Sequence, residues 1–268
     1  MTKKITVRKG QLGLLSRQGD YYQVLEAGEH RLPWFNVPDV LIVNRDGSEV
    51  PEALAEYLRR FQPEWVERYC LAADLTDIET GALYANGVLQ DILPPSTRRL
   101  YWSAGDEMRL LRIDTRQVEV PADIMNAVLQ PRRHGAVKGR EAILTVSVPA
   151  WHVGVLKIDG ETQSLLQPGL SAYWKVNHLV EAEVVDTRLQ VLEVGGQEIL
   201  TKDKVNLRLN LAANWRYSDV LQAFGQLTKP LDHLYRELQF ALREAVGTRT
   251  LDELLEDKKI IDEVVSAQ

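Results

Sequence analysis

The fold is decided by the stretch at residues 151–174, which reads WHVGVLKIDGETQSLLQPGLSAYW. Short apolar runs alternate here with glycines and a Pro-Gly pair, which is the punctuation of β-hairpins. When the glycines are matched, the stretch aligns with two earlier parts of the chain. The three copies are Gly13, Gly19, Gly28, Trp34 and Asp46; Gly81, Gly87, Ser96, Trp102 and Asp114; and Gly154, Gly160, Gly169, Trp174 and Asp186. The sequence therefore predicts three β-hairpin units, with Gly154 and Gly160 in hairpin turns.

Each copy closes on an alternating strand, and two of these strands end in the same tripeptide, Asp114-Thr115-Arg116 and Asp186-Thr187-Arg188. Copies one and two continue through Glu49-Val50-Pro51 and Glu119-Val120-Pro121 into a helix-like stretch. Proline is harmless there because the first helical N–H groups have no partner in the helix. The alternative is that Gly, Pro and Trp coincide by chance in turn-rich sequence. The shared exit favours a duplicated β-rich scaffold.

The tryptophans of the three copies, Trp34, Trp102 and Trp174, have two interpretations. Indole rings favour the membrane interface, so they could be membrane anchors. Their repetition favours instead a shared packing site, since tryptophan is largely buried on average.

A basic stretch, Gln130–Arg140, separates the two halves of the sequence. It is rich in Gly, Pro, Lys and Arg, so we expect a linker here, between a β-rich region at 1–135 and a second domain at 141–268. The basic residues of 132–140 could touch anionic lipid or another subunit, but such a run is commonly a solvated loop.

The last third of the sequence predicts one long strand followed by a helix. Apolar and polar residues alternate from Val205 to Tyr217, as in a strand with one buried face. Ser218 can cap the helix that follows, and Pro230 ends it.

Two further helices follow in the predicted order. Apolar residues recur at three- and four-residue steps over 231–246, and Gly247 stops that helix as a C-cap. Thr250 and Glu253 form a capping box for a third helix, which reaches Val265. The predicted fold class is thus α+β.

Composition excludes several classes of protein. With 268 residues and 45% apolar content, the chain can bury the cores of two domains. Its net charge of −6 gives no reason to bind nucleic acid. No apolar run approaches the length of a signal peptide core or a membrane span, so we expect no transmembrane segment. A single cysteine, Cys70, allows no internal disulfide and fits a reducing compartment.

We find no pattern of catalytic, cofactor-binding or metal-binding residues. The histidines show no metal-ligand spacing, and these are His30, His134, His152, His178 and His233. Cys70 has no nucleophile signature, and Asp114 and Asp186 read as satisfied turn or subunit contacts beside arginines. A hydrolase is disfavoured because no nucleophile and base can be nominated.

Residues 148–268 resemble the SPFH (band-seven, prohibitin-homology) domain of stomatin- and slipin-type proteins. The matching segments are Val153–Leu156, Leu166–Leu170, Asp186–Arg188, Val205–Tyr217 and Ala241–Leu255. The last of these is the strongest signal, because a core helix, a glycine and a capped restart fix the angle between two helices.

The resemblance implies a non-enzymatic, membrane-associated scaffold that organises or regulates partner membrane proteins. It also implies a homo-oligomer that acts with membrane lipid or a membrane protein, of which a membrane protease is one candidate, and that uses no cofactor. We expect it in the cytoplasm or at the cytoplasmic face of a membrane. Subunit number and partner identity are left open.

Two departures from the family pattern qualify this expectation. Stomatins carry a membrane-inserting segment before the domain and further strands and a coiled coil after it, and this sequence has neither. We therefore expect a fragment of a longer protein. The departures also weaken the expectation that this protein inserts directly into a membrane. The alternative function is a soluble protein- or peptide-binding module that uses exposed strand edges.

Overall fold

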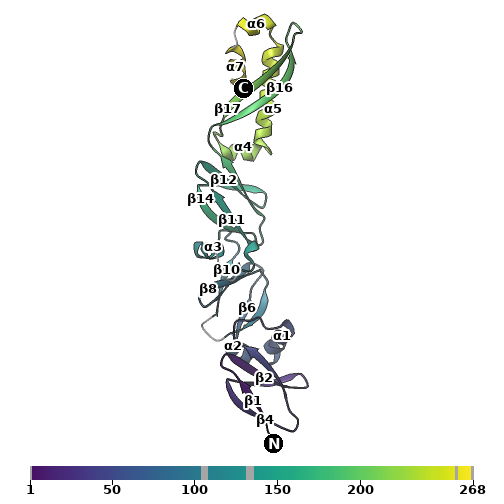
Figure 1. Cartoon of the computed structure of the whole chain (residues 1–268), viewed down its shortest axis with the longest axis vertical. Coiled ribbons are helices and arrows are strands. Elements are labelled where there is room, and N and C mark those ends of the chain that lie inside the picture. Colours follow the sequence, from purple (N-terminus) through teal and green to yellow (C-terminus); the bar gives the residue numbers. More distant parts are fainter. Residues whose placement is uncertain (1, 104–107, 131–135, 257–258, 267–268) are drawn as a thin grey trace. The chain divides into compact units, whose positions relative to one another are not determined.

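The computed structural model describes residues 2–103, 108–130, 136–256 and 259–266. The chain is an α+β protein, in which strands dominate as far as Trp215 and helices follow (Figure 1). It divides into two compact units: unit 1 is Met1–Thr145 with Ser171–Leu179, and unit 2 is Val146–Leu170 with Val180–Gln268.

Strands β1 to β15 come as three consecutive groups in the described residues. The first group is β1 (Thr2–Val7), β2 (Gln11–Arg17), β3 (Asp20–Leu25), β4 (Gly28–Pro33) and β5 (Asp39–Asn44), followed by helices α1 (Glu52–Phe61) and α2 (Pro63–Tyr69). The second is β6 (Cys70–Asp74), β7 (Glu79–Ala85), β8 (Val88–Leu93), β9 (Arg98–Trp102) and β10 (Met108–Asp114), followed by α3 (Ala122–Leu129) and the 3₁₀ turn η1 (Arg140–Ala142). The third is β11 (Ile143–Val148), β12 (His152–Ile158), β13 (Glu161–Leu166), β14 (Gly169–Trp174) and β15 (Val180–Asp186).

The strands pair in the same order in each group. In the first, β2 lies between β3 and β5 in an antiparallel sheet, while β1 pairs with β4 in a separate one. The second group has the orders β10-β7-β8 and β6-β9, and the third has β13-β12-β15 and β11-β14. The central strand is irregular at the same place each time, between Leu15 and Ser16, Leu83 and Tyr84, and Leu156 and Lys157.

The first matched glycine of each group lies inside a strand, so the predicted hairpin turn at Gly154 was wrong. Gly154 sits within β12, opposite Leu166 of β13 and Val184 of β15. A Cβ atom there would lie 3.1 Å from both Leu166 Cβ and Val148 Cγ2, so any side chain at this position would be crowded. The turn itself is made by Asp159 and Gly160, which both have positive φ (53° and 85°), as a tight hairpin turn requires.

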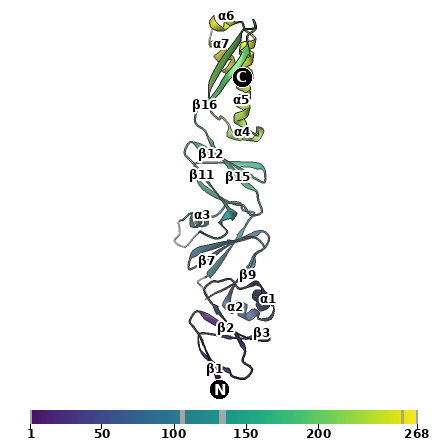
Figure 2. The same ribbon diagram turned by 45° about the vertical axis from the view of Figure 1, so that its right-hand side comes forward.

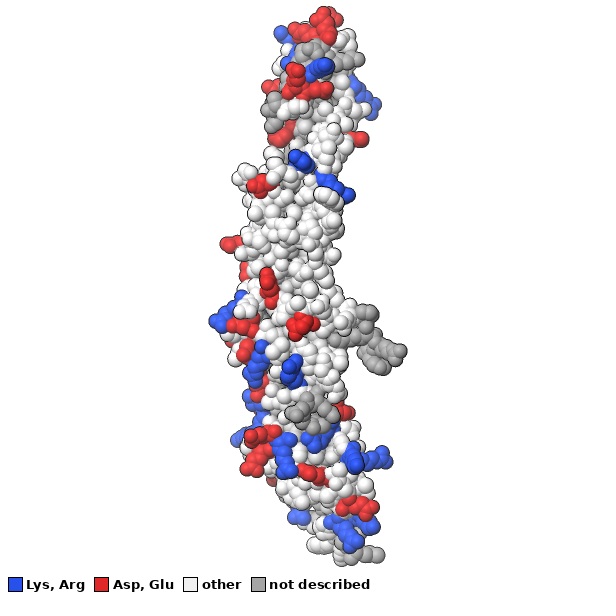
Figure 3. All heavy atoms as spheres, turned by 90° about the vertical axis from the view of Figure 1, so that its left-hand side faces the viewer, with Lys and Arg blue, Asp and Glu red and all other residues white. Residues whose placement is uncertain are grey.

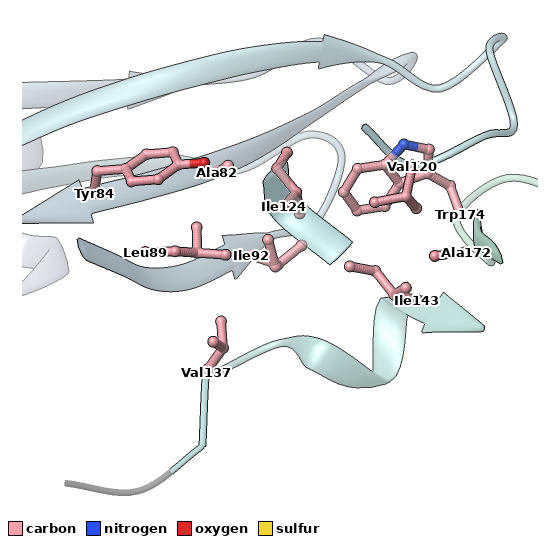
Figure 4. Packing of buried hydrophobic residues seen from close by; sticks show 10 residues of the cluster. All are labelled: Ala82, Tyr84, Leu89, Ile92, Val120, Ile124, Val137, Ile143, Ala172 and Trp174. Atoms are coloured by element: carbon pink, nitrogen blue, oxygen red, sulfur yellow. The ribbon is translucent and has the colours of Figure 1, made fainter. Parts of the chain in front are cut away.

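Two clusters form the main cores of unit 1. In one, Leu12 and Leu14 of β2 pack with Leu58 of α1 and with Leu100 and Trp102 of β9. In the other, Ala82 and Tyr84 of β7 pack with helix α3 and with Ala172 and Trp174 of the Ser171–Leu179 segment (Figure 4). In both clusters a sheet, a helix and the end of a later strand enclose apolar side chains.

The predicted common site of the three tryptophans holds for two of them only. Trp102 and Trp174 end strands β9 and β14 and are buried. Strand β4 ends instead at Pro33, so Trp34 comes one residue too late and its side chain is 65% exposed. The equivalence of Trp34 is therefore corrected.

Part of the predicted basic linker is packed into unit 1. Val137 is buried in the second cluster, and Lys138 forms a parallel bridge with Asp91 at the edge of β8. Gly139 has a φ of 70°, and a Cβ atom there would lie 2.1 Å from the Ile92 carbonyl oxygen. Residues 131–135, with two of the arginines and His134, lie outside the described residues.

Unit 2 continues with a long hairpin and helices. The hairpin strands are β16 (Gln190–Leu200) and β17 (Asn206–Trp215), and the helices are α4 (Val220–Gln226), α5 (Pro230–Gly247), α6 (Leu251–Glu256) and α7 (Lys259–Ser266). Helix α5 runs alongside the hairpin in both ribbon views (Figure 2). The long amphipathic strand is confirmed, because Leu207, Leu209 and Leu211 are half-buried while their neighbours are exposed.

The helix ends differ from the prediction at three places. Asp219 caps α4, since its Oδ1 accepts a hydrogen bond of 2.9 Å from the Gln222 N–H, so Ser218 is not the cap. Helix α5 includes Gly247 without positive φ, and Thr248 closes it by donating its N–H and its hydroxyl to Glu244 O. The third helix is described as two, α6 and α7, and residues 257–258 between them are not described.

Candidate interaction surfaces

The C-terminal part of unit 2 is held together by one apolar contact between the hairpin and helix α5. Leu242 and Val246 of α5 pack against Ile199 of β16, and Leu254 of α6 completes the cluster. The half-buried leucines of β17 lie against the same cluster. The three-residue link between α5 and α6 is bonded to the hairpin turn, where the Lys202 N–H donates to Arg249 O at 2.8 Å.

The start of α6 is fixed by side-chain hydrogen bonds. The Thr250 N–H donates to Glu253 Oε2 at 2.8 Å, and the Glu253 N–H donates to Thr250 Oγ1 at 3.4 Å, so the predicted capping box is confirmed. Asp203, in the hairpin turn, accepts a further bond from the Leu251 N–H at 3.2 Å. The Thr201 hydroxyl donates to the same carboxylate and lowers the Asp203 pKa. The hairpin turn thus supplies a second cap that sequence reasoning missed.

A cavity of about 400 Å³ lies between the end of β17 and helices α4, α5 and α7. Its walls are mainly apolar and include Trp215, Tyr217 and Leu238, with His233 and Glu237 among its polar lining. The ring centroids of Trp215 and Tyr217 are 5.0 Å apart in an edge-to-face contact. This cavity could take an apolar group, and Ser218 and Asp219 add further polar atoms to its lining.

These features coincide with a match to a known family. The model of the SPFH domain / Band 7 family matches residues 146–268. Stomatin homologues of Pyrococcus horikoshii and Pyrococcus abyssi are each 35% identical to the chain over 104 residues, which are 36% of this chain and 38% of each relative. Stomatin-3 of Caenorhabditis elegans is 32% identical over 76 residues, 28% of each chain.

Residues 146–268 belong to the SPFH domain / Band 7 family. The predicted stomatin-type resemblance is therefore confirmed for this part of the chain. The aligned region covers about two fifths of the length of the Pyrococcus relatives, at 38%.

The Asp-Thr-Arg tripeptide of the SPFH domain forms a closed turn. Arg188 donates through Nε and Nη2 to the Asp186 carboxylate at 2.9 and 2.6 Å, which lowers the Asp186 pKa. The Thr187 N–H and hydroxyl both donate to the carbonyl of Trp151. His152 Nε2 lies 3.7 Å from the same aspartate. The Asp186 carboxylate is thus occupied by hydrogen bonds within the turn.

The same motif recurs in unit 1, where the Arg116 guanidinium and N–H bind Asp114 and lower the pKa of that carboxyl to about 2. Burial raises the pKa of the Cys70 thiol to about 11, so the thiol is protonated at neutral pH. In unit 1, His30 Nε2 lies 2.7 Å from the Glu26 carbonyl oxygen, and in unit 2, His233 lines the SPFH cavity. In the described residues, no three His, Cys, Asp or Glu side chains are grouped to hold a metal ion.

The SPFH domain exposes large apolar side chains that sequence reasoning missed. Trp151 is 72% exposed and has a φ of 64°, a left-handed conformation that is rare for a bulky residue. Leu189, just after the Asp-Thr-Arg turn that holds the Trp151 carbonyl, is also exposed. Phe240 on α5 is 60% exposed. The available signal was weak, because single apolar residues in turns carry no periodicity.

The charges do not form a single-sign surface. Where charged residues gather on the face drawn in Figure 3, Lys and Arg lie next to Asp and Glu. Among the described residues, no helix is both long and apolar enough to cross a membrane. The candidate interaction surfaces are therefore apolar spots on a mixed-charge background.

Proposed function

We propose that this protein is a non-enzymatic, oligomeric scaffold of the stomatin type, which acts at a membrane and organises or regulates partner membrane proteins. The observation that carries the proposal is the SPFH domain match over 146–268, together with the relatives named as stomatins. Its function is then assembly, with no chemical step. A membrane protease is one candidate partner, and the cytoplasmic face is the proposed side of the membrane.

The exposed apolar side chains support an assembly function. Trp151 and Phe240 each leave an aromatic ring in solvent, where it is available to contact another molecule. The Asp114 and Asp186 carboxylates are occupied by arginines, so they are poor candidates for acid–base catalysis. Both observations favour binding over turnover.

Two measurements on the full chain test this proposal. Light scattering coupled to size exclusion should give a mass several times that of the 30.4 kDa monomer. Cell fractionation should place the protein in the membrane fraction. A strict monomer at all concentrations, absent from membranes, would refute the scaffold.

We also propose that the three strand groups are copies of one ancestral unit, with a β-rich region at 1–135 and the SPFH domain at 141–268. The shared pairing order, the strand glycines and the bulges at equal distances support this. Two backbone hydrogen bonds also support it. They follow the closing strands β5 and β10 and run from the Val50 N–H to Leu100 O and from the Val120 N–H to Ala172 O.

A second candidate function is a binding module that takes an extended peptide along a strand edge. The chain itself provides a precedent, because the Ile92 N–H donates to Lys138 O and the Lys138 N–H donates to Gln90 O along the edge of β8. The two-stranded β16-β17 sheet offers further edges in the described part of unit 2. Added backbone hydrogen bonds would supply the affinity.

Hydrogen exchange separates the two functions. A peptide that adds to the β16-β17 sheet should slow exchange of amides along one outer edge, and the protein should stay monomeric. Self-assembly should slow exchange at exposed apolar positions such as Phe240 and should depend on protein concentration. If the amides along this edge exchange equally slowly with and without peptide, the peptide-binding module is excluded.

A further inference from the structure

The loop between β4 and β5 of unit 1 exposes an aromatic pair. Trp34 and Phe35 are 65% and 77% exposed, and their ring centroids are 6.2 Å apart in an edge-to-face contact. Val37 beside them is exposed as well. Together with Asn36, these residues form what we call the Trp34–Val37 loop, which exposes three apolar side chains within four residues.

The backbone holds this loop in a defined shape. Pro33 and Pro38 bracket it, and each proline fixes its own φ. Asn36 between them has a φ of 53°, a conformation that asparagine tolerates better than most residues. Ordering the loop on binding therefore loses little conformational entropy, so the rings are presented ready to insert.

The strand pair that carries the loop does not fit an apolar protein groove. In the β6-β9 sheet, the pairs Cys70–Trp102 and Ala72–Leu100 lie on one face. This face packs into the core cluster that contains Leu12 and Leu58. In β1-β4, the corresponding face carries the exposed pair Lys4–Arg31. A groove like those that receive Trp102 and Trp174 would have to take the charged side chains of Lys4 and Arg31 out of water, which is unfavourable.

The exposed area is also too small for a specific protein interface. Two aromatic side chains bury roughly 300–500 Å² at most, whereas a stable interface buries about 800 Å² on each partner. A bilayer interface requires no shape complementarity, and indole rings favour that layer. Lys3 and Lys4 lie on β1 and Arg31 lies on its partner strand β4, which leads into the loop. These three basic residues can pair with lipid phosphates. The nearby acidic residues are Glu29, 3.9 Å from Lys4, and Asp39 at the start of β5.

We infer that the Trp34–Val37 loop is a peripheral membrane anchor, which inserts the rings of Trp34 and Phe35 into the interface of a phospholipid bilayer. The inference rests on the proposed function in one respect, namely that the protein works at a membrane. It adds a contact point in unit 1, outside the residues that match the SPFH family. The rings provide most of the binding, and the three basic residues add a weaker attraction to anionic headgroups.

Vesicle sedimentation of the full chain tests the anchor. The probes are vesicles of phosphatidylcholine alone and of phosphatidylcholine mixed with phosphatidylglycerol. The double variant Trp34→Ser/Phe35→Ser should reduce the partition coefficient about tenfold on both, which corresponds to about 1.4 kcal/mol. The variant Lys3→Gln/Lys4→Gln should weaken binding to the mixed vesicles only.

The control is Phe61→Ser, because Phe61 is an exposed aromatic of unit 1 (56%) on helix α1 rather than in the loop. It should bind within twofold of the parent protein, and thermal melting should show all variants folded. A second readout uses brominated lipid. Quenching of tryptophan emission should fall in Trp34→Phe, although this variant keeps an aromatic ring and still binds.

The outcomes distinguish this inference from the proposed function. If the parent protein binds vesicles and the double variant binds equally well, the loop is not the anchor, while a scaffold at a membrane still stands. If the parent protein forms oligomers but binds neither kind of vesicle, direct lipid docking is refuted and only the assembly part of the proposal survives. Equal loss of binding in Phe61→Ser would also overturn the loop's specific role.

Discussion

Arg59 shows how single residues connect the first two strand groups in unit 1. Its Nη1 and Nη2 donate to the two carboxylate oxygens of Asp74 at 2.7 and 2.6 Å, and Nη2 also reaches Arg99 O at 3.3 Å. The Arg59 side chain is only 15% exposed while that of Asp74 is 43% exposed, so this fork is shielded from water on the arginine side. Forked, shielded pairs of this kind stabilise a fold more than solvated ion pairs do.

We predict that Arg59→Ala lowers the free energy of unfolding by about 1–2 kcal/mol, because it removes charge-assisted hydrogen bonds and leaves Asp74 without its partner. Arg59→Lys should lose part of this amount, since an ammonium cannot form the fork. Urea unfolding followed by circular dichroism measures both. Arg60→Ala, at the exposed neighbour, is the matched control and should change little. Equal effects at both positions would contradict the assignment.

A second prediction concerns the pH dependence of the Asp-Thr-Arg turn in unit 1. Arg116 stabilises the charged form of Asp114 and depresses its pKa to about 2. Because the folded pKa lies below the ordinary value of about 3.9, the stabilisation is present above about pH 4 and is lost as the pH falls toward 2. Carboxyl NMR titration should give this low midpoint, and Arg116→Gln should return it to the ordinary range. An unperturbed midpoint in the parent protein would refute the pairing.

These two contacts also show which residue-scale features a sequence reveals. The Asp114–Arg116 turn was predictable as a satisfied pair because its partners are two residues apart. The Arg59–Asp74 fork was not, because its partners lie on a helix and a strand that only the folded sheet brings together. The predicted equivalence of Trp34 with the other two tryptophans was wrong for a local reason, because β4 ends one residue earlier than their alignment requires.

At the scale of elements, a glycine without a turn sets the close packing of each central strand. Gly154 faces the Leu166 side chain of the neighbouring strand, with Val148 equally near. Gly13 has the corresponding neighbours, Leu25 Cβ and Val7 Cγ2, at 3.4 and 3.2 Å. Because the contacts include Cβ atoms fixed to the backbone, an added methyl group would crowd the neighbouring strand.

We therefore predict that Gly154→Ala destabilises unit 2 by about 1–3 kcal/mol, the usual penalty for overpacking. Gly225→Ala is the matched control, because Gly225 lies in helix α4 with nothing within 4 Å of an added Cβ atom and without positive φ. It should be neutral or raise stability by about 0.5–1 kcal/mol through better helix propensity. Thermal melting of both variants decides the point, and a destabilised Gly225→Ala or a neutral Gly154→Ala would contradict it.

Helix α6 provides another element-scale prediction. Asp203→Ala removes the acceptor of the Leu251 N–H, while the capping box of Thr250 and Glu253 stays intact. Loss of a cap typically reduces stability by about 1 kcal/mol, so amide exchange in the first turn of α6 should quicken severalfold. Exchange in α4, which has its own cap at Asp219, is the internal control. If amide exchange in α6 is unchanged, the capping box of Thr250 and Glu253 alone is sufficient to stabilise the first turn of the helix.

The helix boundaries illustrate the same division between local and distant causes. The capping box was predictable from Thr250 and Glu253 alone, because the bonds join residues three apart. The second cap at Asp203 was not, since that residue lies 48 positions earlier in the hairpin turn. Gly247 was misread as a left-handed stop, because Thr248 can close the helix with its own hydroxyl.

At the scale of the whole molecule, the order of strands and helices was readable from glycine spacing and periodicity, but the sheets were not. The spacing indicated the hairpins β2-β3, β7-β8 and β12-β13. It did not reveal β1, β6 and β11, whose partners β4, β9 and β14 lie more than twenty residues away. Such non-local pairings leave no local signature, and neither do exposed apolar residues such as Trp151 and Phe240.

The last prediction concerns the assembled protein. If assembly proceeds through the SPFH domain, its exposed apolar side chains become covered. Phe240 is one of them and lies on α5, the helix that also packs on the hairpin. A carboxylate buried there without a partner is strongly unfavourable, so Phe240→Asp should lower the mass measured by light scattering to that of the monomer at low micromolar concentration. Val88→Asp, at an exposed apolar residue of unit 1, should leave the mass unchanged. If Phe240→Asp still forms the same oligomer, the assembly surface does not include this part of α5.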